Sequence, residues 1–122
     1  MTAPVPCILL VDDQRDIVRL LHSTLQTLGH KLDIVDAPSG EEALLVISHQ
    51  KFDLLVSDVR LAGMSGLELV GKVRKRNPGL KVILITGLTD SEVRQQVAEF
   101  GAEAFFYKPV DIIEFRAKVA GC

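Results

Sequence analysis

The sequence has little cysteine, no strong excess of either charge and no long hydrophobic run. Its two cysteines, Cys7 and Cys122, lie near opposite ends of the chain, without CxxC or Cys/His spacing. This excludes the usual zinc sites and favours two free thiols. The formal net charge is −2 and the basic residues are scattered, so direct binding of nucleic acid by this segment is not expected.

Signals for export and for membrane insertion are missing as well. The opening residues Met-Thr-Ala-Pro-Val-Pro lack a basic head and a long apolar centre, and no apolar run approaches the length of a membrane span. We therefore expect a cytoplasmic protein that does not bind membranes. What is present, 48% hydrophobic and 25% charged residues over 122 positions, fits one compact domain over residues 1–122.

Short apolar runs alternate with longer segments of helical periodicity. The runs predict five strands, over residues 7–11, 32–35, 54–56, 82–85 and 104–107. A helix is predicted after each strand. The first helix contains Ile17 and stops at Gly29, and the second begins with a cap at Ser39. The third has an apolar stripe from Leu67 to Val73. The fourth begins at Ser91 and ends at Gly101, and the fifth begins with a cap at Asp111.

This alternation predicts the α/β fold class. Strands that read as continuous apolar runs need helices on both faces of a parallel sheet. With right-handed crossovers, we expect a single doubly wound five-stranded parallel sheet with the flavodoxin-like strand order 2-1-3-4-5. Ligands of such folds bind outside the carboxyl ends of the strands, at the switch point between the first and third strands.

Chemically active side chains follow four of the predicted strands. Asp12 and Asp13 follow the first strand, Asp58 the third, Thr86 the fourth and Lys108 the fifth. Three carboxylates in one crevice repel one another unless a cation neutralises them, and an all-oxygen site suits Mg²⁺. The strand ends therefore predict a magnesium site with room for phosphoryl oxygens.

Four segments resemble the receiver domains of response regulators in two-component signalling, the superfamily of the chemotaxis regulators. They are Leu-Val-Asp-Asp at 10–13, Leu-Val-Ser-Asp-Val-Arg at 55–60, Ile-Thr-Gly at 85–87 and Tyr-Lys-Pro at 107–109. One segment alone would be a weak match. All four occur in the family's order, each behind a predicted strand, and together they cover nearly the whole chain.

The resemblance implies that Asp58 is the phosphoacceptor. It would take its phosphoryl group from the phosphohistidine of a histidine kinase or histidine phosphotransfer protein, or from a small acyl phosphate. The implied Mg²⁺ ligands are Asp13, Asp58 and the main-chain carbonyl of Arg60, with Asp12 acting through a water. Such a chain is a signalling phosphoacceptor rather than an enzyme, because it catalyses only its own phosphorylation and dephosphorylation.

The remaining roles also come from the resemblance. Lys108, aimed by a cis bond before Pro109, would offset the phosphoryl charge, and the Thr86 hydroxyl would bind a phosphoryl oxygen. The main-chain N–H groups of Val59 and Gly87 are expected as further donors.

Phosphorylation is expected to shift a switch made of Thr86 and Phe105. Because Phe105 has no hydroxyl, it would couple to Thr86 through packing alone. The expected output surface is the face formed by the fourth helix, the fifth strand and the fifth helix. The effector is unknown, and a homodimer across the fourth and fifth helices is left open.

The sequence departs from the family pattern in two places. Leu-Ala-Gly at 61–63 stands where many receivers carry Met-Pro-Gly, which predicts a differently shaped loop. Arg60 and Leu88 lie two residues after the phosphoacceptor and after the threonine, at positions that influence attack by water. Since Leu88 cannot orient a water and Arg60 can pair with the phosphoryl group, we favour long-lived phosphorylation.

Other interpretations stay open at this point. Taken singly, Asp13 is a helix cap, Asp58 a turn residue and Lys108 a solvated lysine. A flavin mononucleotide carrier shares the strand order, but Asp12 and Asp13 would repel its phosphate. An aspartate-dependent phosphatase is disfavoured because its two aspartates are separated by one residue. The main alternative is a receiver-shaped interaction module that is never phosphorylated.

Overall fold

The computed structural model describes residues 5–29, 31–61, 63–86, 102 and 104–121. It contains the strands β1 (Cys7–Val11), β2 (Asp33–Ala37), β3 (Leu54–Asp58), β4 (Lys81–Thr86) and β5 (Ala104–Tyr107). The helices are α1 (Arg15–Gln26), α2 (Gly40–His49), α3 (Gly66–Arg76) and α5 (Ile112–Ala120). The helix predicted between Ser91 and Gly101 lies outside the described residues.

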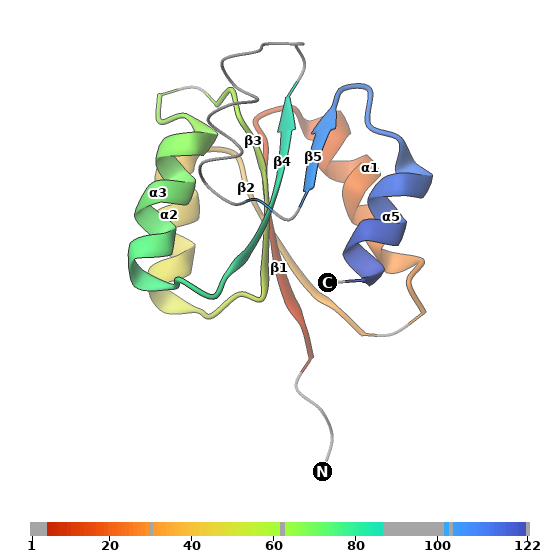
Figure 1. The fold of residues 1–122 in the computed structure, drawn as a ribbon, viewed down its shortest axis with the longest axis horizontal. Helices are drawn as coiled ribbons and strands as arrows, with labels where there is room; N and C mark the ends of the chain where they lie inside the picture. The colour runs from red at the N-terminus through yellow and green to blue at the C-terminus, as the bar shows by residue number, and fades with distance from the viewer. Residues whose placement is uncertain (1–4, 30, 62, 87–101, 103, 122) are drawn as a thin grey trace.

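All five strands are parallel and follow the order β2-β1-β3-β4-β5. Helices α2 and α3 lie against one face of the sheet, and α1 and α5 lie against the other (Figure 1). This confirms the predicted doubly wound sheet and its strand order. The second strand was predicted over 32–35 but covers Asp33–Ala37, because β2 pairs with β1 from Cys7 opposite Asp33 to Val11 opposite Ala37.

The core has two halves, one on each face of the sheet. Successive residues of a strand point to opposite faces, so Leu9 and Leu55 pack under α2 and α3 while Leu10 and Val56 pack towards α1 and α5. Every residue of β1 and of β3 is buried. The central strands are therefore a rigid support for whatever follows their carboxyl ends.

Three of the described helices begin with a side-chain cap, and the fourth does not. Ser39 and Ser65 accept hydrogen bonds from N–H groups three residues later, and Asp111 accepts from two. These bonds satisfy N–H groups that have no partner inside the helix. The caps predicted at Ser39 and Asp111 are confirmed. Helix α1 has Gln14 at this position, and the Gln14 side chain makes no capping bond.

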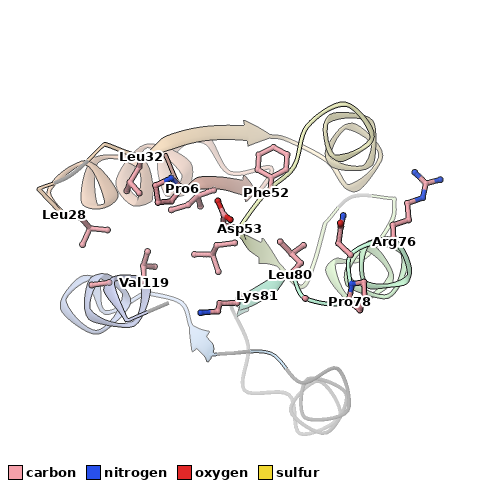
Figure 2. A pocket seen from close by; sticks show the side chains of 15 residues that line it. Pro6, Leu28, Leu32, Phe52, Asp53, Arg76, Pro78, Leu80, Lys81 and Val119 are labelled. Atoms are coloured by element: carbon pink, nitrogen blue, oxygen red, sulfur yellow. The ribbon is translucent and has the colours of Figure 1, made fainter. Parts of the chain in front are cut away.

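A cavity of about 600 Å³ lies at the amino-terminal edge of the sheet (Figure 2). Its walls include Pro6, Ile8 and Val119, with Asp53 and Lys81 among its polar residues. The Asp53 carboxylate accepts the Cys7 N–H at 2.8 Å, so Asp53 completes the start of the sheet. The cavity is at the opposite end of the strands from the predicted site. None of the described helices is long and apolar enough to cross a bilayer.

Candidate functional site

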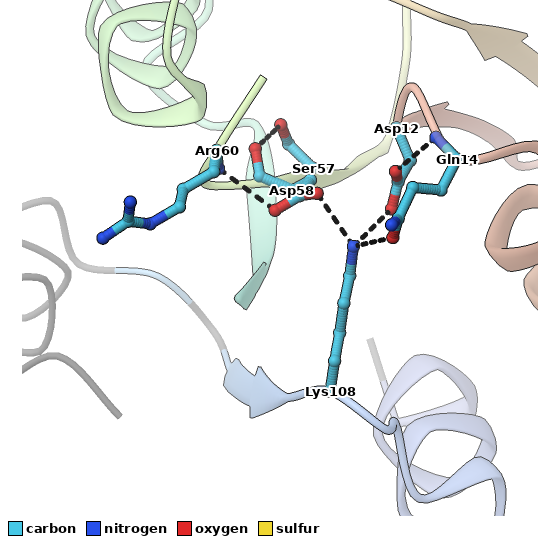
Figure 3. Close-up of polar contacts among 6 residues, drawn as sticks. All are labelled: Asp12, Gln14, Ser57, Asp58, Arg60 and Lys108. Carbon is cyan, nitrogen blue, oxygen red and sulfur yellow. Dashed lines mark hydrogen bonds and ion pairs between the residues drawn. The ribbon is translucent and has the colours of Figure 1, made fainter. Parts of the chain in front are cut away.

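Three strands bring Asp12, Asp58 and Lys108 together at the carboxyl edge of the sheet (Figure 3). Asp12 follows β1 directly, Asp58 is the last residue of β3, and Lys108 follows β5. Because the strands are parallel, their carboxyl ends reach the same edge. The structure thus places these predicted residues at the predicted switch point.

The acidic cluster consists of Asp12, Asp13 and Asp58. Each offers a carboxylate oxygen, and these oxygens lie within 4.8 Å of one another. Asp12 and Asp58 are only 3% and 5% exposed, while Asp13 is exposed. Such a set of hard oxygen donors fits a divalent cation of the Mg²⁺ type.

The electrostatics of the cluster show how unfavourable the bare carboxylates are. Burial raises the pKa of Asp12, and the nearby charge of Asp58 raises it further. The Gln14 N–H, which donates to Asp12 Oδ1 at 2.8 Å, and the Lys108 ammonium lower this pKa without cancelling the rise. The site therefore holds negative charge that a bound cation would neutralise.

Lys108 is the cation that the chain itself supplies. Its Nζ donates to Asp58 Oδ2 at 2.9 Å and to Gln14 Oε1 at 2.7 Å, and it lies 3.3 Å from Asp12 Oδ2. Burial lowers the pKa of Lys108, but the hydrogen bond and charge of Asp58 and the charge of Asp12 outweigh burial, so the pKa is raised. Lys108 is thus a firmly charged ammonium beside the Asp58 carboxylate.

The Asp58 carboxylate is also held by the backbone that follows it. The Arg60 N–H donates to Asp58 Oδ1 at 3.1 Å. The turn after β3 is then closed by Gly66, whose N–H donates to the Val59 carbonyl at 2.8 Å. A Cβ at Gly66 would overlap the Asp58 carbonyl oxygen and lie 2.9 Å from Val59 Cα. Only glycine allows this close approach.

Thr86 ends β4 beside the cluster and is fully buried. Its carbonyl accepts the Lys108 N–H at 2.7 Å. Its hydroxyl Oγ1 has no hydrogen-bond partner among the described residues. Since buried polar atoms are nearly always paired, an unpaired hydroxyl at a strand end is a group available to a ligand.

The aromatic residues of β5 divide between the two faces of the sheet. Phe105 packs against the half of the core under α2 and α3, and its ring meets Tyr107 edge to face at 4.9 Å. Phe106 packs on the other side against Phe115, with ring centroids 5.9 Å apart. Phe105 is only partly buried, like the other residues of β5.

The structure describes one of the two main-chain N–H groups that were predicted to donate hydrogen bonds to the phosphoryl group. The Val59 N–H donates to the Ile85 carbonyl at 2.8 Å, so it must leave that bond before it can serve a ligand. Gly87 lies outside the described residues, as does Leu88. The bond between Lys108 and Pro109 is cis, as the resemblance implied.

Sequence reasoning missed Gln14 and Gly66. Gln14 directly follows the Asp12–Asp13 pair, so examining one more residue after the first strand would have included it. Gly66 follows Ser65 at the start of α3, and a serine–glycine pair there reads as an ordinary helix start. Its packing against Asp58 depends on the turn in three dimensions and leaves no signal in the sequence.

Comparison with known proteins agrees with this geometry. The family model of the response regulator receiver domain matches residues 8–120. The chain is 38% identical over 112 residues to the response regulator protein PilR of Pseudomonas aeruginosa, covering 92% of this chain and 25% of PilR. It is 32% identical over 112 residues to sporulation initiation phosphotransferase F of Bacillus subtilis, covering 92% of this chain and 89% of that protein.

A solved structure gives the same result. The chain is similar to a response regulator receiver protein from Pseudomonas putida, with a TM-score of 0.91, 32% identity and coverage of 99% of this chain and 100% of that one. The chain spans about a quarter of the length of several curated relatives that it matches. The fold, the aspartate cluster with Lys108 and these matches show that the chain belongs to the response regulator receiver family of two-component signalling.

Proposed function

We propose that this domain accepts a phosphoryl group on Asp58 and passes the change to a partner. The observation that carries the proposal is the position of Asp58, whose carboxylate lies 2.9 Å from the Lys108 ammonium and within 4.8 Å of Asp12 and Asp13. A nucleophile beside a fixed ammonium and a cation site has what phosphoryl transfer requires, namely positioning and charge stabilisation.

In the proposed reaction, an Asp58 carboxylate oxygen attacks the phosphorus in line. The bond from phosphorus to the donor breaks, and the leaving atom, an imidazole nitrogen of phosphohistidine or an acyl oxygen, keeps the electron pair. Asp13, Asp58 and the Arg60 carbonyl would hold Mg²⁺, with Asp12 acting through a water. The bound ion would supply positive charge for the phosphoryl oxygens.

The chain's own groups would complete the site. Lys108 would move one N–H from its present acceptors to a phosphoryl oxygen, where a charge-assisted bond is strong. The unpartnered Thr86 hydroxyl would donate to a second oxygen. The N–H groups of Val59 and Gly87 remain predicted donors.

The output would follow from movement of Thr86. If its hydroxyl turns towards the phosphoryl group, the space beside Phe105 changes, and this population shift would reach the face that includes β5 and α5.

Receiver domains generally partner with histidine kinases, so we propose such a kinase or a histidine phosphotransfer protein as the donor. Several relatives are named as transcriptional regulators, which makes an effector elsewhere in a longer protein the proposed recipient. A homodimer across the predicted fourth helix and α5 stays a prediction.

The lifetime of the phosphoryl group is a separate part of the proposal. Arg60 lies next to the site through its backbone, and its side chain can pair with a phosphoryl oxygen. Apolar Leu88 offers no group that orients water. We therefore expect slow hydrolysis of the phosphorylated domain.

The test is intact-mass analysis of the domain after incubation with Mg²⁺ and acetyl phosphate. We expect one phosphoryl adduct that disappears in Asp58→Ala and when a chelator removes the metal. An adduct that persists in Asp58→Ala would place the chemistry elsewhere. The absence of an adduct with acetyl phosphate and with a phosphorylated kinase would favour the interaction module that is never phosphorylated.

A further inference from the structure

Among the described residues whose side chains contact Lys108 Nζ, Gln14 is the one to which the proposed function gives no role. Its backbone is fixed at the start of α1: its N–H donates to Asp12 Oδ1, and its carbonyl accepts from Ile17 and Val18. Its side chain does not cap the helix. It reaches instead across to the residue after β5, where Oε1 accepts from Lys108 Nζ at 2.7 Å.

The chemistry of the two groups fixes the orientation of this amide. An ammonium has three N–H donors and no acceptor, so the amide oxygen, not the nitrogen, must face it. Among the described residues, Nζ donates hydrogen bonds to Asp58 Oδ2 and Gln14 Oε1, while Asp12 Oδ2 is an ion-pair neighbour at 3.3 Å that accepts no hydrogen bond, so these are the three oxygens nearest to Nζ. The contact of Gln14 is the shortest of the three, and Gln14 is the only uncharged member.

To pair closely with a phosphoryl oxygen on Asp58, Lys108 Nζ must turn from the position that its two hydrogen bonds fix. Of these two hydrogen bonds, the one to the Asp58 carboxylate joins two charged groups, whereas the one to Gln14 joins one charged and one neutral group. The amide is consequently the acceptor that Lys108 leaves most readily. An interaction present before the transfer and absent during it stabilises the resting state and slows the reaction.

We propose that Gln14 is a positioning residue that restrains Lys108 in the resting domain and thereby limits the rate at which Asp58 is phosphorylated. The proposal rests on the function proposed above. After phosphorylation, Lys108 is already on the phosphoryl group and Gln14 is released. The phosphorylated domain and the transition state of its hydrolysis then both lack the Gln14 bond, so the rate of hydrolysis should not depend on Gln14.

The test compares wild type with Gln14→Leu, which keeps the size of the side chain but removes the acceptor. Phosphorylation by acetyl phosphate and Mg²⁺ is followed by intact mass, and hydrolysis is followed after removal of the donor. We expect Gln14→Leu to be phosphorylated roughly 2- to 10-fold faster, the range that one net hydrogen bond corresponds to, with an unchanged hydrolysis rate. Gln14→Glu, which surrounds Lys108 with a third carboxylate, should be phosphorylated more slowly than wild type.

The matched control is Gln26→Leu, the same substitution at an exposed position at the far end of α1, which should change neither rate. Slower or unchanged phosphorylation of Gln14→Leu, or equal changes in both of its rates, overturns the restraint while leaving phosphorylation of Asp58 intact. Wild type without an adduct overturns the proposed function itself, and the inference with it. The wild-type result therefore separates the two failures.

Discussion

The residues of the site are held in a balance of opposing charges. Asp12 and Asp58 are buried side by side, and Lys108 is the ammonium that pairs with both of them in the described part of the chain. The raised pKa of Asp12 shows that this ammonium does not compensate for burial and for the charge of Asp58. The negative charge that Lys108 does not compensate favours binding of a cation, but in the metal-free domain it destabilises the folded state.

This balance predicts that Asp12→Asn stabilises the metal-free domain. The folded-state pKa of Asp12 lies above its unfolded value, so the folded state binds the proton more tightly. The free energy of unfolding then falls as pH rises from the unfolded to the folded pKa, and the full penalty is present above the folded pKa. Asparagine removes the charge and keeps the Oδ1 acceptor for the Gln14 N–H. We expect a gain of about 0.5–2 kcal/mol at pH 7, measured by urea unfolding in chelator.

The pH series and a surface control test the cause of this gain. The difference between Asp12→Asn and wild type should shrink as pH is lowered towards the ordinary carboxyl range, because wild-type Asp12 then becomes protonated. The exposed Asp36, which lies 3.9 Å from Arg15, provides the control, and Asp36→Asn should change stability by less than about 0.5 kcal/mol. A gain that is independent of pH would contradict the assignment to charge.

The site residues could be read from the sequence only where topology brings them together. Asp12, Asp58 and Lys108 each lie at or directly after the end of a strand, and parallel strands end at one edge, so their meeting was predictable. The hydrogen bond from Lys108 to Gln14 was not, because it depends on the length and direction of two side chains 94 residues apart. The Val59 N–H was predicted as a donor to the phosphoryl group, and in this structure it donates to the Ile85 carbonyl, a contact that the sequence did not reveal.

At the scale of elements, the joint between β3 and α3 determines where the phosphoacceptor lies. Gly66 starts α3 directly against the end of β3. We expect Gly66→Ala to destabilise the domain by about 1–3 kcal/mol or more, because the new methyl group meets backbone atoms that cannot move independently. The displaced atom is the Asp58 carbonyl oxygen, so phosphorylation by acetyl phosphate should also slow.

Gly79 provides the matched control for this substitution. It lies in the turn before β4, and a Cβ there meets nothing within 4 Å. Gly79→Ala should leave phosphorylation unchanged and alter stability by less than about 1 kcal/mol. Thermal unfolding of both variants measures the difference, and equal losses would show that close packing at Gly66 is not the cause.

Element boundaries illustrate a second limit of the sequence. Caps at Ser39 and Asp111 were predictable because the bond joins residues two or three positions apart. The ends of β2 were not, because β2 is an edge strand whose length is set by pairing with β1. The sequence therefore predicts helix starts that depend on neighbouring residues, whereas the ends of an edge strand depend on the strand with which it pairs.

At the scale of the whole molecule, binding and support are separated between the two ends of the sheet. The carboxyl edge carries the aspartate cluster. At the amino-terminal edge, the Asp53 carboxylate accepts a hydrogen bond from the start of β1, and the walls of the cavity mix apolar with polar residues. A ligand that neutralises the cluster should therefore stabilise the entire cooperative unit, since it binds the folded chain and not the unfolded one.

The last prediction follows from this linkage and concerns Mg²⁺. At a concentration a hundredfold above its Kd, Mg²⁺ should raise the free energy of unfolding of wild type by about 2.7 kcal/mol, seen as a higher Tm. Asp13→Asn is the informative variant, because Asp13 is the exposed member of the cluster and its loss should not disturb the core. Its Tm should respond much less to Mg²⁺. Sodium chloride at matched ionic strength controls for screening of surface charges, and an equal rise of Tm with either salt would mean that the cluster holds no specific ion.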